Sequence, residues 1–458
     1  MPSRTIQKQN NRALWVILIA AVAVRLVLAA ATAGYPYDMS CFIAWGDKLF
    51  TEGPANFYSE GYFADYPPGY LPVLAAVAGL RKLFGVAGDG PVGRVLLALV
   101  PSVCDAGLIA LVHCIARRRM GESRQTFCLT LFTAFCPLFL FDTGLWKQID
   151  GAFVLPLALC FWLLENRRYL PAALLYGVAL SIKPQALLAG PVLAVCFLAG
   201  VADARREGGS VGRAVGRVFG GAAAALAVPV AAGLPFFGVR VLPALLQKYF
   251  ETSSGYPYAT VNAFNWFAAL GGNWAPLADQ AIGPFSWGTL GVVHIVLLTA
   301  ALAVLAVVSW RADARTGDRA HTGPRRFSPL LLAAFYTAGI FVLAHCMHER
   351  YLVLGVVLAL LSAARWGDIR LYGAAFGLSL TGFLNLAAVY TQAGTDDEWL
   401  SAAASQTFVR AVGLACTVAF VLLALTTVTL CRGGRVSPLR RAETGGAQPD
   451  LLVARPTP

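Results

Sequence analysis

Long apolar runs fill most of this chain and predict a bundle of membrane-spanning helices. A helix needs roughly 20 apolar residues to cross a bilayer, and fewer when it packs inside protein. Short loops that contain Lys and Arg separate most of the runs. The pattern predicts an all-α polytopic membrane protein with about twelve transmembrane helices, at residues 13–33, 92–116, 125–141, 151–165, 170–183, 185–201, 214–236, 287–310, 328–346, 351–364, 371–391 and 407–431.

One further apolar run, from Tyr70 to Val86, decides the topology. If it crosses the bilayer, the cluster Arg117–Arg119 falls outside and every later loop inverts. If it lies along the outer surface as an amphipathic helix, nearly all the basic loops fall on one side. Because Lys and Arg concentrate in cytoplasmic loops, the second arrangement is favoured. We therefore expect both termini in the cytoplasm.

Two long segments then lie outside, at residues 34–91 and 237–286. Both are rich in aromatic residues and prolines, a composition typical of the membrane–water interface. We expect the first segment to carry surface helices. Residues 1–431 are expected to form one transmembrane domain, and residues 432–458 a disordered cytoplasmic tail.

The composition supports a membrane protein and excludes other classes. The 458 residues are 58% apolar and only 13% charged, too few charges for a soluble domain of this length. The net charge of +12 is spread through short loops, so we expect the lipid bilayer as a partner and no nucleic acid. The ten cysteines lie mostly in apolar runs without a CxxC pair, which indicates core residues rather than disulfides or metal ligands. The first run is long for a cleaved signal peptide, so we expect a retained helix.

Unusual polar residues gather on the predicted outer side. Asp38 follows the first span just after Pro36, where a carboxylate can accept a proton if its neighbours hold it. It could equally be an ordinary interfacial acid. The motif Asp65-Tyr66-Pro67-Pro68 combines a fixed extended turn with an anchoring tyrosine. A plain helix start is an equally good interpretation.

Two outer turns each contain a lysine. Lys147 and Asp150 share a tight turn between two spans, and Lys183 lies two residues before Gln185 at a proline break. Lys147 and Asp150 could simply pair with each other. Ionisable residues near a membrane are costly enough to suggest a functional cavity, and a half-buried lysine suits a phosphate ligand.

A third polar group lies at the outer end of the ninth span, with His345, His348, Glu349 and Arg350. His-x-x-His suggests a metal site, and His348-Glu349 forms half of a zinc-protease motif. Leu352 stands where that motif needs its second histidine, so we discount the protease and expect no metal. A cationic cluster that grips a lipid phosphate fits better, because Arg350 can bind phosphate bidentately.

Taken in order, these motifs resemble the GT-C superfamily of membrane glycosyltransferases, which use polyprenyl-phosphate-linked sugars. In particular they resemble the dolichyl-phosphate-glucose glucosyltransferase branch (glycosyltransferase family 57) and its bacterial relatives. Six short motifs of that branch have counterparts in this chain. They are an acid in the first outer loop, an Asp-Tyr-Pro-Pro element, an aspartate after the third span, a Lys-Gln pair that matches loosely, an Asn-x-Trp element that matches in outline, and a His-Glu-basic element. The matching residues are Asp38, Asp65–Pro68, Asp150, Lys183 with Gln185, Asn265-Trp266 and His348–Arg350.

The chain also departs from that branch at two places. Arg350 replaces the family's lysine and keeps its charge. Gly151-Ala152-Phe153 stands where the eukaryotic enzymes have a stretch rich in His and Gln. The resemblance therefore concerns the mechanism of the superfamily, and neither the same sugar nor the same acceptor is implied.

The resemblance implies a GT-C-like fold whose residues 1–431 form the catalytic domain. It implies an inverting transferase that moves one hexose or pentose from a polyprenyl-phosphate donor to a glycolipid or cell-envelope glycan on the exoplasmic face. Asp38 would be the general base, with no cofactor, and the donor phosphate would meet Arg350, Lys183 and His348. Supporting or substrate-binding roles would fall to Asp65, Tyr66, Lys147, Asp150, Gln185, Asn265, Trp266, His345 and Glu349.

A flippase or secondary transporter of polyprenyl-linked lipids or sugars is the alternative. Such a protein should place ionisable residues near the middle of the bilayer and on both faces. Arg25 lies well inside a long apolar run, but few ionisable residues do, which favours the enzyme.

Overall fold

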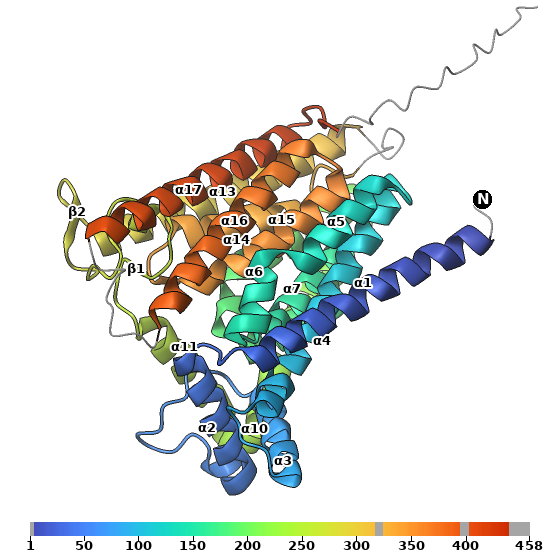
Figure 1. Ribbon diagram of the computed structural model, residues 1–458. Helices are drawn as coiled ribbons and strands as arrows, with labels where there is room; N and C mark the ends of the chain where they lie inside the picture. The colour runs from blue at the N-terminus through green and yellow to red at the C-terminus, as the bar shows by residue number, and fades with distance from the viewer. Residues whose placement is uncertain (1–3, 317–323, 394–402, 439–458) are drawn as a thin grey trace, which may run out of the picture.

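A computed structural model of the chain describes residues 4–316, 324–393 and 403–438. Most of these residues are helical, and short strands occur only near one end of the bundle (Figure 1). The helices are α1 (Arg4–Ala31), α2 (Pro36–Glu52), η1 (Pro54–Asn56), α3 (Leu71–Phe84), α4 (Pro91–Met120), α5 (Arg124–Phe135), α6 (Pro137–Phe139), η2 (Leu140–Trp146), α7 (Asp150–Glu165), α8 (Tyr169–Ile182), η3 (Pro184–Ala189), α9 (Gly190–Arg206), α10 (Val211–Phe237), η4 (Gly238–Arg240), α11 (Val241–Ser254), α12 (Trp266–Ala269), α13 (Trp287–Thr316), α14 (Pro329–Leu343), η6 (Glu349–Tyr351), α15 (Leu352–Trp366), α16 (Ile369–Gln392) and α17 (Ala403–Cys431).

Within the described residues, eight helical segments are long and apolar enough to cross a membrane. They confirm the predicted class of multi-pass, all-α membrane protein. The eight are Arg12–Ala31, Pro91–Met120, Arg124–Trp146, Pro184–Arg206, Val211–Thr252, Trp287–Arg315, Ile369–Gln392 and Ser405–Cys431. The predicted spans at 151–165, 170–183, 328–346 and 351–364 correspond to the shorter apolar helices α7, α8, α14 and α15.

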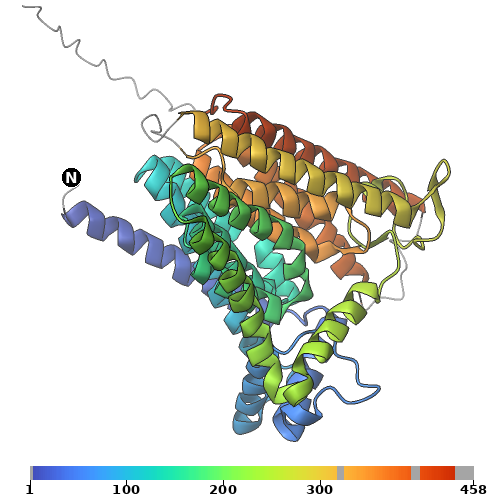
Figure 2. The ribbon, with the colours of Figure 1, turned by 180° about the vertical axis from the view of Figure 1, so that it is seen from behind.

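The short helices α14 and α15 form the centre of the bundle. Almost all of their side chains are buried, and the surrounding helices separate them from the outside (Figures 1 and 2). Gly355 of α15 lets the two backbones approach, since a Cβ there would lie 3.0 Å from the Cα of Ala338. Small residues of this kind allow close packing between membrane helices.

Helices α2 and α3 pack against each other outside one end of the bundle (Figure 1). α3 covers most of the Tyr70–Val86 run, has 14 residues and is not among the eight long apolar segments. Its buried side includes Leu71 and Leu74. Gly46 of α2 meets the carbonyl oxygen of Leu74, which would lie 2.7 Å from a Cβ at that position. The contact fixes α2, whose first turn contains Asp38.

Four short strands belong to the second long outer segment and to the turn after α14. β1 (Thr260–Val261) pairs in parallel with β4 (Met347–His348), and β2 (Gln280–Ile282) pairs with β3 (Phe285–Ser286) in an antiparallel hairpin. In the first pair Val261 lies opposite His348. This pairing ties two segments far apart in sequence into one end of the bundle.

The described part of the C-terminal tail, residues 432–438, contacts the start of α16. The backbone N–H of Ile369 donates to the Ser437 carbonyl at 2.9 Å, and the Ser437 N–H donates to the Asp368 carboxylate at 2.9 Å. Asp368 is the N-cap of α16, so the tail shares the cap of that helix. Residues 439–458 lie outside the described residues.

Candidate functional site

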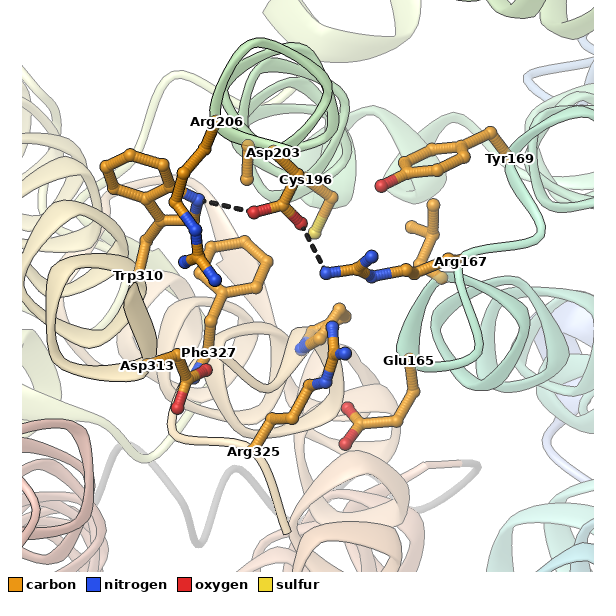
Figure 3. A pocket seen from close by; sticks show the side chains of 13 residues that line it. Glu165, Arg167, Tyr169, Cys196, Asp203, Arg206, Trp310, Asp313, Arg325 and Phe327 are labelled. Atoms are coloured by element: carbon orange, nitrogen blue, oxygen red, sulfur yellow. Dashed lines mark hydrogen bonds and ion pairs between the residues drawn. The ribbon is translucent and has the colours of Figure 1, made fainter. Parts of the chain in front are cut away.

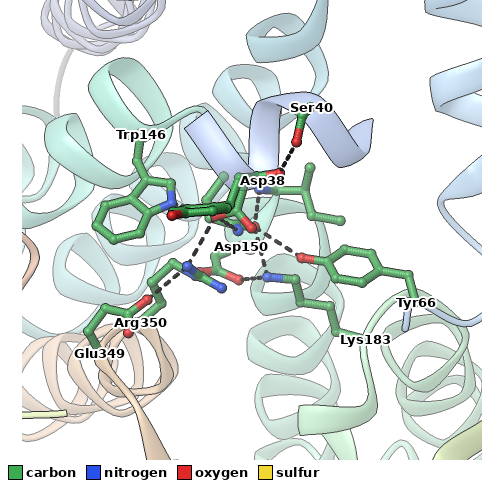
Figure 4. A network of polar contacts seen from close by, with 11 residues as sticks. Asp38, Ser40, Tyr66, Trp146, Asp150, Lys183, Glu349 and Arg350 are labelled. Atoms are coloured by element: carbon green, nitrogen blue, oxygen red, sulfur yellow. Dashed lines mark hydrogen bonds and ion pairs between the residues drawn. The ribbon is translucent and has the colours of Figure 1, made fainter. Parts of the chain in front are cut away.

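Asp38 lies in the first turn of α2, which begins at Pro36 because proline fits the first position of a helix. Its Oδ2 accepts three hydrogen bonds, from Trp146 Nε1 at 2.6 Å, Gln148 Nε2 at 2.9 Å and Arg350 Nη1 at 3.1 Å (Figure 4). The donors come from two other parts of the chain, so tertiary contacts fix the carboxylate. All three bonds end on the same oxygen, which leaves Oδ1 as the one that can receive a proton.

Arg350 connects Asp38 to a second carboxylate. Its Nη1 also donates to Glu349 Oε1 at 2.8 Å, and its guanidinium lies 5.2 Å from the ring centre of Trp146. Burial disfavours the charged guanidinium, but the carboxylates of Asp38 and Glu349 hold the pKa of Arg350 above its usual value. Nε of Arg350 is buried without a partner. Arg350 is therefore a fixed cation with donor capacity to spare.

Gln148 is the hub of this network. Its amide nitrogen donates to Asp38, while its Oε1 accepts from Lys183 Nζ at 2.9 Å and from the Tyr66 hydroxyl at 3.3 Å. Lys183 also forms an ion pair with Asp150. One neutral side chain thus joins a carboxylate to a lysine and a tyrosine from two other segments.

The turn that holds Gln148 is built by a π-helix. η2 closes the long helical segment that begins at Arg124, and a π-helical turn accommodates an extra residue that redirects the chain. Lys147 then takes a left-handed conformation with φ 68°. Trp146 stacks on Tyr35 with ring centres 4.1 Å apart. Trp146 and Gln148 therefore bond to Asp38, whereas Lys147 between them points away from it.

Sequence reasoning missed Trp146 and Gln148. The turn attracts attention for its charged residues Lys147 and Asp150, whereas an indole and an amide give no charge signal. Their position in the same short outer turn is the signal that could have found them.

Lys147 does not join the network, although we expected it in a supporting role. Its Nζ donates to Thr32 Oγ1 at 2.8 Å and to the Leu145 carbonyl at 2.9 Å, beside the end of α1. Its side chain is almost fully buried, and this burial lowers its pKa to about 7. Lys147 secures the turn rather than facing the cluster.

His348 lies beside Arg350 but is not the cation that we expected. Its ring packs between those of Tyr256 and Tyr351, with centres 4.7 and 5.2 Å away. Burial, together with the nearby charge of Arg350, lowers the pKa of His348 to about 3. The imidazole is therefore neutral near pH 7 and can offer a hydrogen bond but no charge.

Glu349 and His345 are also affected by burial. Glu349 is buried, which raises its pKa despite the neighbouring Arg350. His345 points toward α13, where a Cβ at Gly291 would lie 2.3 Å from its Nδ1. That nitrogen is buried without a partner, and burial lowers the pKa of the ring. Glu349 belongs to the network, and His345 lies outside it.

The Asp65–Pro68 turn reaches the network through Tyr66, whose ring also lies 5.3 Å from Lys183 Nζ. Asp65 stands beside it, and burial raises the pKa of its carboxyl group. Its backbone carbonyl accepts from Thr252 Oγ1 at 3.0 Å, which joins the first outer segment to α11.

Two of the predicted elements, Asn265-Trp266 and Gln185, lie outside the network. Asn265 is fully buried and caps α12, with its Oδ1 accepting from the Phe267 N–H at 3.0 Å, while its Nδ2 donates to the Phe341 carbonyl at 2.9 Å. Trp266 packs against the core from the first position of the same helix. Gln185 faces a small cavity with its Oε1 unpartnered.

Arg25, the charged residue inside the first span, is buried in a small polar cluster next to η2. Its Nε bonds Asp105 Oδ2 at 2.8 Å, and Thr143 Oγ1 donates to the same oxygen at 2.8 Å. Its Nη1 donates at 2.9 Å to the Ala134 carbonyl, near the break before Pro137. The charge of Arg25 is thus paired with Asp105, which also holds Thr143 of the π-helix that carries Trp146.

The cluster brings the anchored carboxylate of Asp38 together with two cations, Arg350 and Lys183, which also pair with Glu349 and Asp150. An anchored carboxylate can take a proton from a hydroxyl, and fixed cations can stabilise a phosphate. Among the residues that the structure describes, no three His, Cys, Asp or Glu side chains come together in a way that could hold a metal ion.

Fold and cluster together define a multi-pass helical membrane protein with a polar site at one end. Comparison with family models finds no match, and neither does comparison with curated proteins. Among solved structures, the chain is similar to ArnT from Cupriavidus metallidurans bound to undecaprenyl phosphate, with 14% identity and a TM-score of 0.48 over 91% of this chain and 77% of that one.

Two archaeal structures are similar at comparable levels. The Archaeoglobus fulgidus oligosaccharyltransferase in the apo form has 15% identity and a TM-score of 0.43, covering 93% of this chain and 57% of that one. AglB from the same organism, in complex with an inhibitory peptide and a dolichol-phosphate, has 13% identity and a TM-score of 0.42, covering 93% and 56%.

Proposed function

We propose that this chain is an inverting glycosyltransferase. It moves a single hexose or pentose from a polyprenyl-phosphate donor to a glycolipid or cell-envelope glycan. The observation that carries the proposal is the Asp38 carboxylate, held by three donors on one oxygen with two cations in the same network. The order of the outer-loop motifs supports the same class of reaction.

Asp38 acts as the general base. Its Oδ2 is fixed by Trp146, Gln148 and Arg350, and Oδ1 takes the proton of the acceptor hydroxyl. The acceptor oxygen attacks the anomeric carbon as the bond from that carbon to the phosphate oxygen breaks. The bonding electrons leave with the lipid phosphate, and the configuration at the anomeric carbon inverts.

Arg350 and Lys183 stabilise the phosphate as its charge grows. Arg350 also donates to Glu349, so its guanidinium is shared among Asp38, Glu349 and the phosphate. His348, being neutral, contributes a hydrogen bond. Asp65 and Tyr66 line the side of the cluster formed by the first outer segment.

We further propose that the cluster lies on the exoplasmic face, with α2 and α3 on the outer surface and both termini in the cytoplasm. Cysteine labelling at a site introduced beside Arg119 tests this orientation. The site should be protected from an impermeant reagent in intact cells, and labelling from outside would overturn the topology.

The deciding experiment is a transfer assay with purified protein in detergent. The donors are polyprenyl-phosphate glucose, mannose, galactose and arabinose, and the acceptors are lipid-linked and envelope glycans. We expect product with one donor, and Asp38→Asn should reduce turnover by roughly 10²–10⁴-fold because it removes the proton acceptor.

Asp47→Asn is the matched control, since Asp47 lies on the same helix and its carboxylate contacts Arg81 at 3.4 Å rather than the cluster. It should keep near wild-type turnover. Equal turnover of the Asp38→Asn protein would contradict the assignment of the base. Movement of intact donor lipid across vesicles without any product would favour the flippase alternative.

A further inference from the structure

A second polar pocket lies at the opposite end of the bundle (Figure 3). It is formed where α7 ends and α8 begins, by the last turns of α9 and α13, and by the segment that precedes α14. Its charged and aromatic lining includes Glu165, Arg167, Asp203, Arg206, Trp310 and Arg325. The proposed transfer reaction uses none of these residues.

The carboxylates of this pocket are engaged by the protein itself. Asp203 accepts from Trp310 Nε1 at 2.8 Å through one oxygen and from Arg167 at 2.8 Å through the other. Glu165 accepts from Arg365 at 3.1 Å and from the Ser328 hydroxyl at 2.8 Å. Asp313, the third acid of the lining, accepts from the backbone N–H groups of Arg326 and Phe327 at 2.9 and 3.0 Å. Each of the three acids thus has donors from the protein itself.

Arginines from different segments also line the pocket. A guanidinium has five N–H donors in a rigid fork, which is more than one protein contact uses. Arg206 and Arg325 both point into the pocket in Figure 3, from different segments. Two guanidinium groups that face one space suit a phosphate, which can accept several charge-assisted hydrogen bonds.

An apolar groove adjoins this pocket. It runs between α9 and α13, and its walls include Leu198 and Ala202 on one side and Ala303 and Val307 on the other. Leu198 is 63% exposed, as expected of a side chain that faces lipid. The groove and the polar pocket share three lining residues, Ala199, Trp310 and Phe327.

We propose that groove and pocket together bind one anionic glycerophospholipid. An acyl chain lies between α9 and α13, and the phosphate lies between Arg206 and Arg325. A single amphipathic ligand explains why an apolar groove leads into an arginine-lined pocket, and basic pockets between membrane helices commonly bind anionic headgroups. Trp310 at the junction fits the interface level of a bilayer. This inference does not rest on the proposed transfer reaction.

Native mass spectrometry of the full chain in neutral detergent tests the proposal, with phosphatidylglycerol and phosphatidylcholine of identical chains as probes. We expect phosphatidylglycerol to be retained preferentially. The double variant Arg206→Gln/Arg325→Gln should bind it roughly tenfold or more weakly, because it loses charge-assisted hydrogen bonds. Arg12→Gln/Arg213→Gln removes the same charge from exposed positions elsewhere and should bind like the wild type.

Three results would overturn the proposal. The two lipids could bind alike, both double variants could bind like the wild type, or glycerophosphate without chains could compete as well as the lipid. Preference for undecaprenyl phosphate over phosphatidylglycerol would reject the proposed occupant. Ala199→Leu, which narrows the junction without altering charge, should weaken phosphatidylglycerol binding, and a thermal unfolding scan verifies that each variant is folded.

Discussion

Helix α7 begins in one polar cluster, at Asp150, and ends in another, at Glu165, so its 16 residues separate the two by about 24 Å. Both clusters pair carboxylates with cations, but they differ in whether buried polar atoms remain without a hydrogen-bond partner. The Asp150 end keeps buried atoms without partners, among them Asp150 Oδ2 and Arg350 Nε. Glu165 has protein donors on both carboxylate oxygens.

The difference shows which ion pairs hold the fold and which await a ligand. Buried polar groups are normally satisfied, so unpartnered atoms that cluster beside an anchored carboxylate indicate a place for substrate. Complete pairing at Glu165 indicates a structural joint, and the ligand that we propose there binds to arginines rather than to the acids. Matched substitutions at the two ends of α7 test this contrast.

The largest contrast is expected between two arginines. Arg350→Gln should lower transfer by roughly 10²-fold, mainly through weaker use of the donor, because it removes a cation that faces the leaving phosphate. Steady-state kinetics with the donor varied measures this loss. Arg365→Gln, which breaks the pair with Glu165, should leave donor use unchanged, and an equal loss in both variants would erase the distinction.

The second contrast concerns stability. Glu165→Ala should destabilise the protein by about 3 kcal/mol, because removing one partner of a buried ion pair leaves the Arg365 charge uncompensated. Thermal unfolding in detergent measures the shift. Asp47→Ala affects a more exposed pair and should cost less than about 1 kcal/mol. A smaller loss for Glu165→Ala than for Asp47→Ala would refute the structural role.

The third contrast concerns Gln148 and its hydrogen bonds within the network. Gln148→Leu removes a donor to Asp38 and the acceptor for Lys183, so transfer should fall by about tenfold. Gln247→Leu is the control, since Gln247 lies on α11 and contacts Glu251 rather than the cluster. If the two variants lost the same activity, Gln148 would not be the hub.

The last prediction concerns the pH dependence of stability that arises from Lys147. Its pKa of about 7 in the folded protein lies below its unfolded value, so the unfolded state binds more protons between about pH 7 and 10. Stability should therefore rise with pH across that window. Lys147→Met should flatten the rise in melting temperature, and an unchanged slope would contradict the buried lysine.

The site was only partly predictable from the sequence. Asp38, Asp150, Lys183 and Arg350 stand out because charges at the edge of apolar runs are costly. The sequence could not show that Lys147 turns toward α1 or that His348 is neutral, because a left-handed residue and the packing of two tyrosine rings decide these outcomes.

Local composition alone therefore determined the class of protein: long apolar runs and scarce charge dictate a helical membrane bundle, since the bilayer requires every backbone group to be satisfied within helices. The tertiary structure decided which residues meet. Trp146 and Gln148 donate hydrogen bonds to Asp38, and so does Arg350, which lies 312 positions away in the sequence. Hydrogen bonds of this kind depend on how helices pack, which no local pattern records.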